Sequence, residues 1–213
     1  MKCCQCQGIE ELFSESYVRK ELAEYRRRGP EKTTRMLINA LKSKGVQGLN
    51  LLDIGGGVGA IQYEMLNAGA ESAMDVEASS AYLAVARAEA ERRGISDRIS
   101  YQRGNFVALA PQVAAADIVT LDRVICCYDD MESLVSRSVE KARKFYGLVY
   151  PRDTWWVRLG LDIQNLFLRL TRRQYRSFVH PTKAVEALVT RSGFRRDFYR
   201  QTIVWQVVVY SRR

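Results

Sequence analysis

The stretch LLDIGGGVGAI, residues 51–61, constrains this chain more than any other part of it. Four glycines between positions 55 and 59 follow an apolar run that is typical of a buried strand. Glycines at this density allow a sharp turn into a helix and let the backbone approach a ligand closely. The run satisfies a D-x-G-x-G-x-G spacing from Asp53 and also the G-x-G-x-x-A spacing of a dinucleotide site. The motif therefore predicts a nucleotide-like ligand without choosing one.

Apolar runs typical of strands alternate with segments of helical periodicity along most of the chain. Strands are expected at 49–55, 72–77, 99–104, 116–125 and 146–153. Helices are expected at 60–70, 80–94, 131–145 and 180–194. This alternation predicts an α/β fold with a doubly wound, mostly parallel sheet and helices on both faces. Two further strands follow residue 194 without a long crossover, so we expect that pair to be antiparallel.

The N-terminal segment has its own helical pattern. Apolar residues recur at helical spacing from residue 9, and Gly29-Pro30 divides the segment because proline disrupts a helix interior. The second helix is expected at 31–43. A length of 213 residues with 47% hydrophobic composition suits one packed domain. We therefore expect a helical cap over 1–44 and a Rossmann-like domain over 45–213.

The net charge of +9 comes from the end of the chain, because residues 152–213 hold 13 basic and 4 acidic residues. This excess indicates an acidic partner: a carboxylate substrate, a nucleic acid or an anionic membrane surface. Within it, residues 154–180 combine an apolar stripe with arginines. We interpret this insertion as a lid over a large, apolar, anionic acceptor. A helix packed on the sheet and a helix on a membrane surface stay open as alternatives.

Acidic residues beside the glycine run bear on the ligand. Asp53 stands at the end of the strand before the glycines, where a dinucleotide-binding strand is usually apolar. A carboxylate there suits a ligand that carries an ammonium group better than a pyrophosphate. Glu77, at the end of the next strand, fits an acid-x-Ser-x-x-x-Leu pattern and is the candidate partner of ribose hydroxyls, whereas Asp75 is interpreted as an in-strand residue.

These features together resemble the class I S-adenosylmethionine-dependent methyltransferases. The resemblance rests on Asp53 to Gly59, on Glu77, on RGNF at 103–106, on LDRV at 121–124 and on the terminal strand pair. It implies a seven-stranded sheet with a reversed C-terminal strand and S-adenosyl-L-methionine as the cofactor. A second, weaker likeness joins YPR at 150–152, HP at 180–181 and GF at 193–194 to small-molecule O-methyltransferases of the magnesium-protoporphyrin type.

The resemblance also implies a set of cofactor-binding residues. The predicted set is Asp53, Gly55, Gly56, Gly57, Gly59, Glu77, Ala78, Asn105, Phe106 and Asp122. In it Asp53, Gly55 and Gly57 line the methionine portion, Glu77 accepts from the ribose hydroxyls, and Asn105 and Phe106 flank the adenine. Many family members have aspartate where this chain has Asn105.

Catalytic residues are harder to see, because methyl transfer depends mainly on holding the acceptor in line with the leaving sulfur. His180, the single histidine of the chain, is a candidate base, although its place before a helix also suits capping or packing. Tyr128, near the end of the fourth strand, can face the acceptor or pack beside a loop. Arg123 follows Asp122 at the point where that strand meets cofactor and substrate.

The cysteines indicate a reduced protein. Cys3, Cys4 and Cys6 can ligate a soft metal, but no second cluster accompanies them and the chain has one histidine, so no metal site is predicted. Cys126 and Cys127 are adjacent and do not form a disulfide framework. With neither a membrane-span pattern nor a secretory signal in the sequence, we expect a cytoplasmic protein.

The leading hypothesis is a methyltransferase that acts on a small molecule, with O-methyl transfer to an apolar, anionic acceptor. An RNA or protein methyltransferase that uses the basic C-terminal third is the alternative, although no RNA-binding module is recognised. An NAD-dependent oxidoreductase stays open on the G-x-G-x-x-A spacing, and a non-catalytic cofactor-binding protein is a further option. The oligomeric state is left open.

Overall fold

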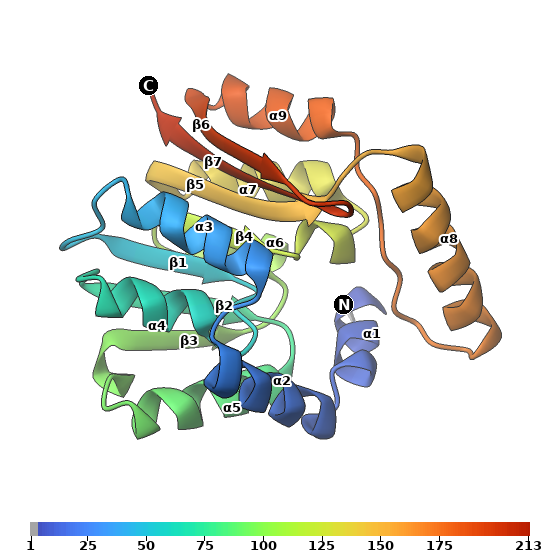
Figure 1. Ribbon diagram of the computed structural model, residues 1–213, viewed down its shortest axis with the longest axis horizontal. Helices are drawn as coiled ribbons and strands as arrows, with labels where there is room; N and C mark the ends of the chain where they lie inside the picture. The colour runs from blue at the N-terminus through green and yellow to red at the C-terminus, as the bar shows by residue number, and fades with distance from the viewer. Residues whose placement is uncertain (1–3) are drawn as a thin grey trace.

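The computed structural model describes residues 4–213, with side chains described from residue 8 onward. It contains a seven-stranded sheet in the order β3-β2-β1-β4-β5-β7-β6, with β7 antiparallel to both of its neighbours (Figure 1). The strands are β1 Asn50–Ile54, β2 Ser72–Glu77, β3 Ile99–Arg103, β4 Ala116–Asp122, β5 Ala142–Pro151, β6 Phe194–Gln201 and β7 Trp205–Arg212. The predicted fold class, including the reversed final strand, is confirmed.

Helices cover both faces of the sheet (Figure 1). The α-helices are α1 Cys4–Leu12, α2 Glu15–Arg28, α3 Lys32–Lys42, α4 Ala60–Asn67, α5 Ser80–Arg92, α6 Phe106–Leu109, α7 Met131–Glu140, α8 Trp155–Leu170 and α9 Thr182–Arg191. Three 3-10 turns are η1 Ser96–Arg98, η2 Ala110–Gln112 and η3 Ile125–Cys127. Successive strand residues serve opposite cores: Leu51 packs with α2 to α5, and Leu52 packs with α6, α7 and α9.

Strand order fixes where a ligand can lie. β1 pairs in parallel with β2 on one side and with β4 on the other, so the chain reverses its winding direction at β1. In sheets of this kind the crevice beyond the carboxyl ends of such strands is the usual binding place. The register sets Asp53 beside Asp75 of β2 and Thr120 of β4, directly below that crevice.

Several predicted element boundaries differ from the structure, and two of them have a clear physical reason. The first helical segment is broken before Ser14, whose hydroxyl accepts from Tyr17 N (3.4 Å) and caps a new helix, α2. The helix predicted at 131–145 ends at Glu140. The strand then begins at Ala142, because it pairs with β4 from that residue onward and with β7 from Phe145. Strand pairing thus overrides the helical periodicity of these residues.

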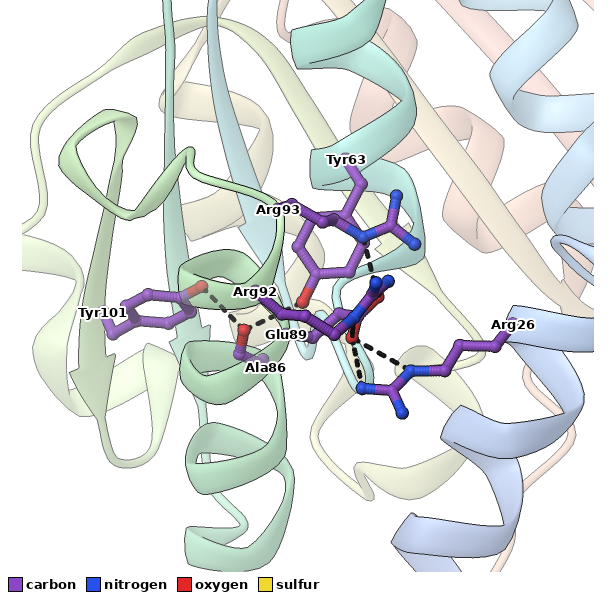
Figure 2. A network of polar contacts seen from close by, with 7 residues as sticks. All are labelled: Arg26, Tyr63, Ala86, Glu89, Arg92, Arg93 and Tyr101. Atoms are coloured by element: carbon purple, nitrogen blue, oxygen red, sulfur yellow. Dashed lines mark hydrogen bonds and ion pairs between the residues drawn. The ribbon is translucent and has the colours of Figure 1, made fainter.

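A buried ion cluster fastens the N-terminal helices to the domain (Figure 2). The carboxylate of Glu89 in α5 is fully buried and meets three guanidinium groups, with nitrogen–oxygen distances of 2.6 Å to Arg26, 2.7 Å to Arg92 and 2.8 Å to Arg93. Arg26 belongs to α2, so this cluster joins segments 63 residues apart. Direct hydrogen bonds to these groups hold the pKa of Glu89 at about 2, despite burial.

The segment predicted as a lid, residues 154–180, is α8 followed by an extended run. Figure 1 shows α8 standing beside the carboxyl ends of the strands, with its outer side turned away from the rest of the molecule. Within the described residues, no helix is both long enough and apolar enough to cross a bilayer.

Candidate active site

The glycine run forms a tight turn between β1 and α4. Gly55, Gly57 and Gly59 have φ angles of 69°, 57° and 84°, in the left-handed region that favours glycine. Gly56 is needed for a different reason: a Cβ there would lie 2.3 Å from Gln62 Nε2 and 2.9 Å from Asp53 Oδ2. At Gly56 the turn therefore packs directly on the side chains beneath it. Gly57 lines the cavity described below.

Buried carboxylates support this turn from below. Asp53 accepts from Thr120 Oγ1 (2.6 Å) and Gln62 Nε2 (3.3 Å). Burial raises the pKa of Asp53 to about 7, although these hydrogen bonds lower it. Asp75 accepts from Gly56 N (3.2 Å), and burial together with the neighbouring carboxylates raises its pKa as well. Its role beneath the turn agrees with its interpretation as an in-strand residue.

Glu77 lies at the end of β2 and touches the same turn. Its Oε2 accepts from Gly57 N (3.2 Å) and its Oε1 from Ser79 N (2.8 Å). Burial raises the pKa of this carboxyl, against the backbone hydrogen bonds that lower it. Two of the carboxyls, Asp53 and Glu77, line the cavity. Glu77 suits the hydroxyl donors of a ribose, and Asp53 suits a cation better than a pyrophosphate.

A cavity of about 430 Å³ opens above the turn, at the carboxyl ends of the strands. Nine of the ten predicted cofactor-binding residues line it: Asp53, Gly55, Gly56, Gly57, Glu77, Ala78, Asn105, Phe106 and Asp122. Gly59, although described, is not among the lining residues. It starts α4, and a Cβ on it would lie 2.5 Å from the Tyr63 ring.

A second polar group gathers where β4 ends. Asp122 is buried; its Oδ2 accepts from Thr34 Oγ1 of α3 (2.5 Å), and its Oδ1 lies 3.3 Å from Arg123 Nε. Apart from this ion pair, that buried Oδ1 accepts no hydrogen bond from any residue that the structure describes. Burial raises the pKa of Asp122, and Arg123 lowers it in part.

Arg123 lines the cavity in a conformation that few non-glycine residues adopt, with φ at 61°. Its Nη1 also binds Glu31 Oε2. Burial opposes the charge of this guanidinium, but Asp122, Glu31 and Glu21 outweigh burial and raise its pKa. Arg123 is therefore a fixed positive charge on an otherwise acidic wall. Strained backbone of this kind is common at functional sites.

Tyr128 also lines the cavity, on the side of η3. Asn105 Nδ2 donates to Tyr128 Oη at 3.0 Å, and Asn105 Oδ1 accepts from Val107 N and caps α6. Nearby, Cys127 Sγ lies 3.0 Å from Tyr175 Oη, which joins η3 to the run that follows α8. The free thiols of Cys126 and Cys127 are part of this wall.

His180 stands apart from the other candidates. Its Nε2 donates to the carbonyl oxygens of Tyr128 (2.8 Å) and Ile125 (3.2 Å), and its ring stacks on Phe178. It is not one of the described residues that line the cavity. This geometry favours packing, the second interpretation made from sequence: His180 holds the main chain of η3, which carries Tyr128.

The N-terminal helices also contribute to the site, which the sequence did not indicate. Tyr17, Glu21 and Thr34 line the cavity from α2 and α3, and Glu21 accepts from Tyr82 Oη at 2.6 Å. The lid segment adds Leu161 and Gln164. No local motif marks these residues. The side chains of Cys3, Cys4 and Cys6, which the sequence offers as metal ligands, lie outside the side chains that the structure describes. The described residues contain no cluster of three metal-ligating side chains.

The topology, the reversed final strand and the carboxylate-supported glycine turn define the Rossmann-like fold of the class I methyltransferases. Residues 52–143 match the family profile described as a methyltransferase domain. This match and the fold support a class I S-adenosylmethionine-dependent methyltransferase, an enzyme, and the NAD-dependent alternative is set aside. No curated protein matches the sequence.

Solved structures share the fold at low identity. Magnesium protoporphyrin IX methyltransferase from Synechocystis PCC 6803, with bound S-adenosylhomocysteine, is 16% identical at a TM-score of 0.70, over 96% of this chain and 98% of that one. A putative RNA methyltransferase from Pyrococcus horikoshii is 15% identical at a TM-score of 0.63, over 87% of this chain and 84% of that one. An O-methyltransferase family protein from Burkholderia thailandensis is 15% identical at a TM-score of 0.65, over 84% of this chain and 56% of that one.

Proposed function

We propose that this enzyme transfers a methyl group to an anionic oxygen of a small, largely apolar acceptor. One observation carries the proposal: a single cavity joins a carboxylate-rich floor at the glycine turn to an apolar wall. Ile9, Leu12 and Phe13 from the N-terminal segment and Leu161 from α8 contribute to that wall. A donor and an acceptor of opposite character therefore find adjacent places in one cavity.

The donor fits the floor. S-adenosylmethionine carries its reactive methyl group on a positively charged sulfur. Asp53 and Asp122 give that end of the cavity a negative potential, and Oδ1 of Asp122, which has only its ion pair with Arg123, is the proposed acceptor for an ammonium group or a hydroxyl. Glu77 is the proposed partner of the ribose hydroxyls. Asn105 and Phe106 are the proposed neighbours of the adenine.

The acceptor side has one feature that selects an anion. Arg123 contacts Glu31 through Nη1 and Asp122 through Nε, and neither contact uses Nη2. We assign this nitrogen to an anionic oxygen of the acceptor. The arginines of the lid, Arg169, Arg172, Arg173 and Arg176, are not among the described residues that line the cavity, so they do not fill this role.

An acceptor that arrives ionised needs no general base. Catalysis then consists of excluding water and holding the oxygen in line with the methyl group, at roughly 3–3.5 Å. Tyr128, fixed by Asn105, is the proposed positioning group, and His180 supports the loop that carries it. The free thiols of Cys126 and Cys127 fit the cytoplasm, which is part of the proposal.

The test combines binding and turnover. Calorimetry compares S-adenosylhomocysteine with NAD, and only the first is expected to bind. Methyl-labelled donor is then incubated with aromatic and porphyrin carboxylic acids, each matched with its amide, which lacks the anionic oxygen. Label is expected in the acids alone. Equal labelling of acids and amides would contradict the role of Arg123.

RNA is the second candidate, because β6 carries exposed arginines and one structural neighbour is a putative RNA methyltransferase. Arg195 and Arg200 are not among the described cavity-lining residues, which favours the small molecule. Label in RNA, with binding that weakens steeply as salt rises, would assign the enzyme to RNA instead.

A further inference from the structure

The outer side of α8 is an unpartnered apolar surface. Seven large apolar side chains on this helix are exposed, by 42% to 75%: Trp155, Trp156, Leu159, Ile163, Leu166, Phe167 and Leu170. Their spacing places them along one side of the helix. Contiguous apolar surface of this kind is rare on proteins that remain free in water.

Closure of a lid over the active site does not explain this surface. The opposite side of α8 already faces the protein: Val157 is buried, and Leu161 and Gln164 line the cavity. A movement of α8 toward the cavity would therefore press that inner side inward and leave the outer side in water. Figure 1 shows no other element beyond the outer side of α8.

The apolar surface continues onto the turn between β6 and β7. Ile203 and Val204 in this turn are 78% and 40% exposed. Arg152 connects the turn to α8, since its Nη1 donates to Thr202 O (3.1 Å) and its guanidinium lies 5.6 Å from the Trp156 ring centre. The helix and the turn thus form one surface, called here the docking face.

Positive charge surrounds the docking face. Residues 152–178 contain six arginines and two aspartates. One of the aspartates, Asp153, is already bound to Arg158. Arg169 and Arg172 stand exposed at the C-terminal end of the helix. Apolar side chains beside exposed arginines match the interface of a bilayer that contains anionic lipids.

We propose that the docking face lies on an anionic lipid bilayer, with α8 in the plane of the interface. At 16 residues α8 is about 24 Å long, shorter than the roughly 30 Å core of a bilayer. A second copy is a poorer occupant, because paired docking faces would bring two arginine-rich rims together. Since the inner side of α8 lines the cavity, docking would hold the active site next to a membrane that dissolves apolar acceptors.

The test is sedimentation with vesicles of phosphatidylcholine, either alone or with about one third phosphatidylglycerol. The wild type is expected to bind the anionic vesicles, and less so as salt rises. Leu166→Ser with Leu170→Ser, both at exposed positions, should weaken binding about tenfold or more. Arg169→Gln and Arg172→Gln should each weaken binding about fivefold. The control Asp162→Ser changes an exposed residue of the same helix and should bind at least as well as the wild type.

Absence of wild-type binding to anionic vesicles would overturn the proposal, as would a Leu166→Ser, Leu170→Ser protein that binds like the wild type. Light scattering tests whether a second copy of the chain binds the docking face instead. If the wild type is a dimer that does not bind vesicles, and the double variant is a monomer, the surface would be assigned to a second copy. Melting curves verify folding. Calorimetry with S-adenosylhomocysteine should give equal affinities for all variants, so a failed membrane proposal is distinguishable from a failed methyl-transfer proposal.

Discussion

Gly57 gives the sharpest test of the donor site, because the chain contains a matched control. Its φ is +57°, and a Cβ added there would have as its nearest described atom a ring carbon of Tyr82, at 3.8 Å. Gly94, after α5, has a φ of +68° and no described atom within 4 Å of such a Cβ. Alanine at either position therefore carries the same backbone strain, but only Gly57 lines the cavity.

The strain sets the expected stability of both variants. An L-residue in the left-handed region costs roughly 1–2 kcal/mol. For a chain of this size, 1 kcal/mol corresponds to a change in melting temperature of about 2–4 °C. Gly57→Ala and Gly94→Ala should therefore melt about 2–8 °C below the wild type, by similar amounts.

The affinity for S-adenosylhomocysteine should separate the two variants. The methyl group of Gly57→Ala would occupy space above the turn that the ligand needs, so we expect a loss of tenfold or more, about 1.4 kcal/mol. Gly94→Ala should bind like the wild type. Calorimetry and melting curves measure the two quantities. Equal affinities for the two variants would refute the assignment of this turn to the donor.

Four other side chains give further expectations. Because a cationic ligand favours the charged form of Asp53, S-adenosylmethionine affinity should rise with pH up to about 7, and Asp53→Asn should flatten that profile in calorimetry. Glu89→Gln should lower the free energy of unfolding by about 2–3 kcal/mol in urea melts, since it leaves three arginines without their buried partner; a loss under about 0.5 kcal/mol would contradict this. The low pKa of Glu89 also means that its contribution is present above pH 4.5 and is lost as the pH falls toward about 2. Tyr128→Phe should lower kcat about tenfold, whereas His180→Gln, which keeps a donor, should stay within about threefold; the reverse order would restore His180 as the base.

The parts of the site that the sequence predicted are those that local structure determines. The glycine turn follows from residues adjacent in the chain, and the strand register brings Asp53 and Glu77 to the same edge. Both the fold class and the membership of Asp53, Glu77 and Asp122 in one cavity could therefore be anticipated. Element ends were less predictable: the strand at Ala142 depends on pairing with β4, which no short window contains.

The parts that could not be predicted depend on the docking of distant segments. Thr34 reaches Asp122 across 88 positions of the chain, and Arg26 reaches Glu89 across 63. Neither pair has a spacing that a sequence pattern reveals. His180 is also a residue whose surroundings the sequence does not reveal. Its residue type suits catalysis, but its Nε2 is hydrogen-bonded to the carbonyl of Tyr128.

We expect specificity for the donor to come from the acids beneath the glycine turn rather than from the glycines. Asp53, Asp75 and Glu77 place three buried carboxyls there, and Asp53 and Glu77 line the cavity. Burial raises the pKa of each, so the site without ligand disfavours the charged form of these carboxyls. A bound cation would stabilise the charged form of these carboxyls, whereas a bound phosphate would destabilise it. We therefore expect Asp53, within the strand before the glycines, to favour a cationic donor over a dinucleotide on this shared fold. We expect the N-terminal helices and α8, which line the rest of the cavity, to determine which acceptor binds.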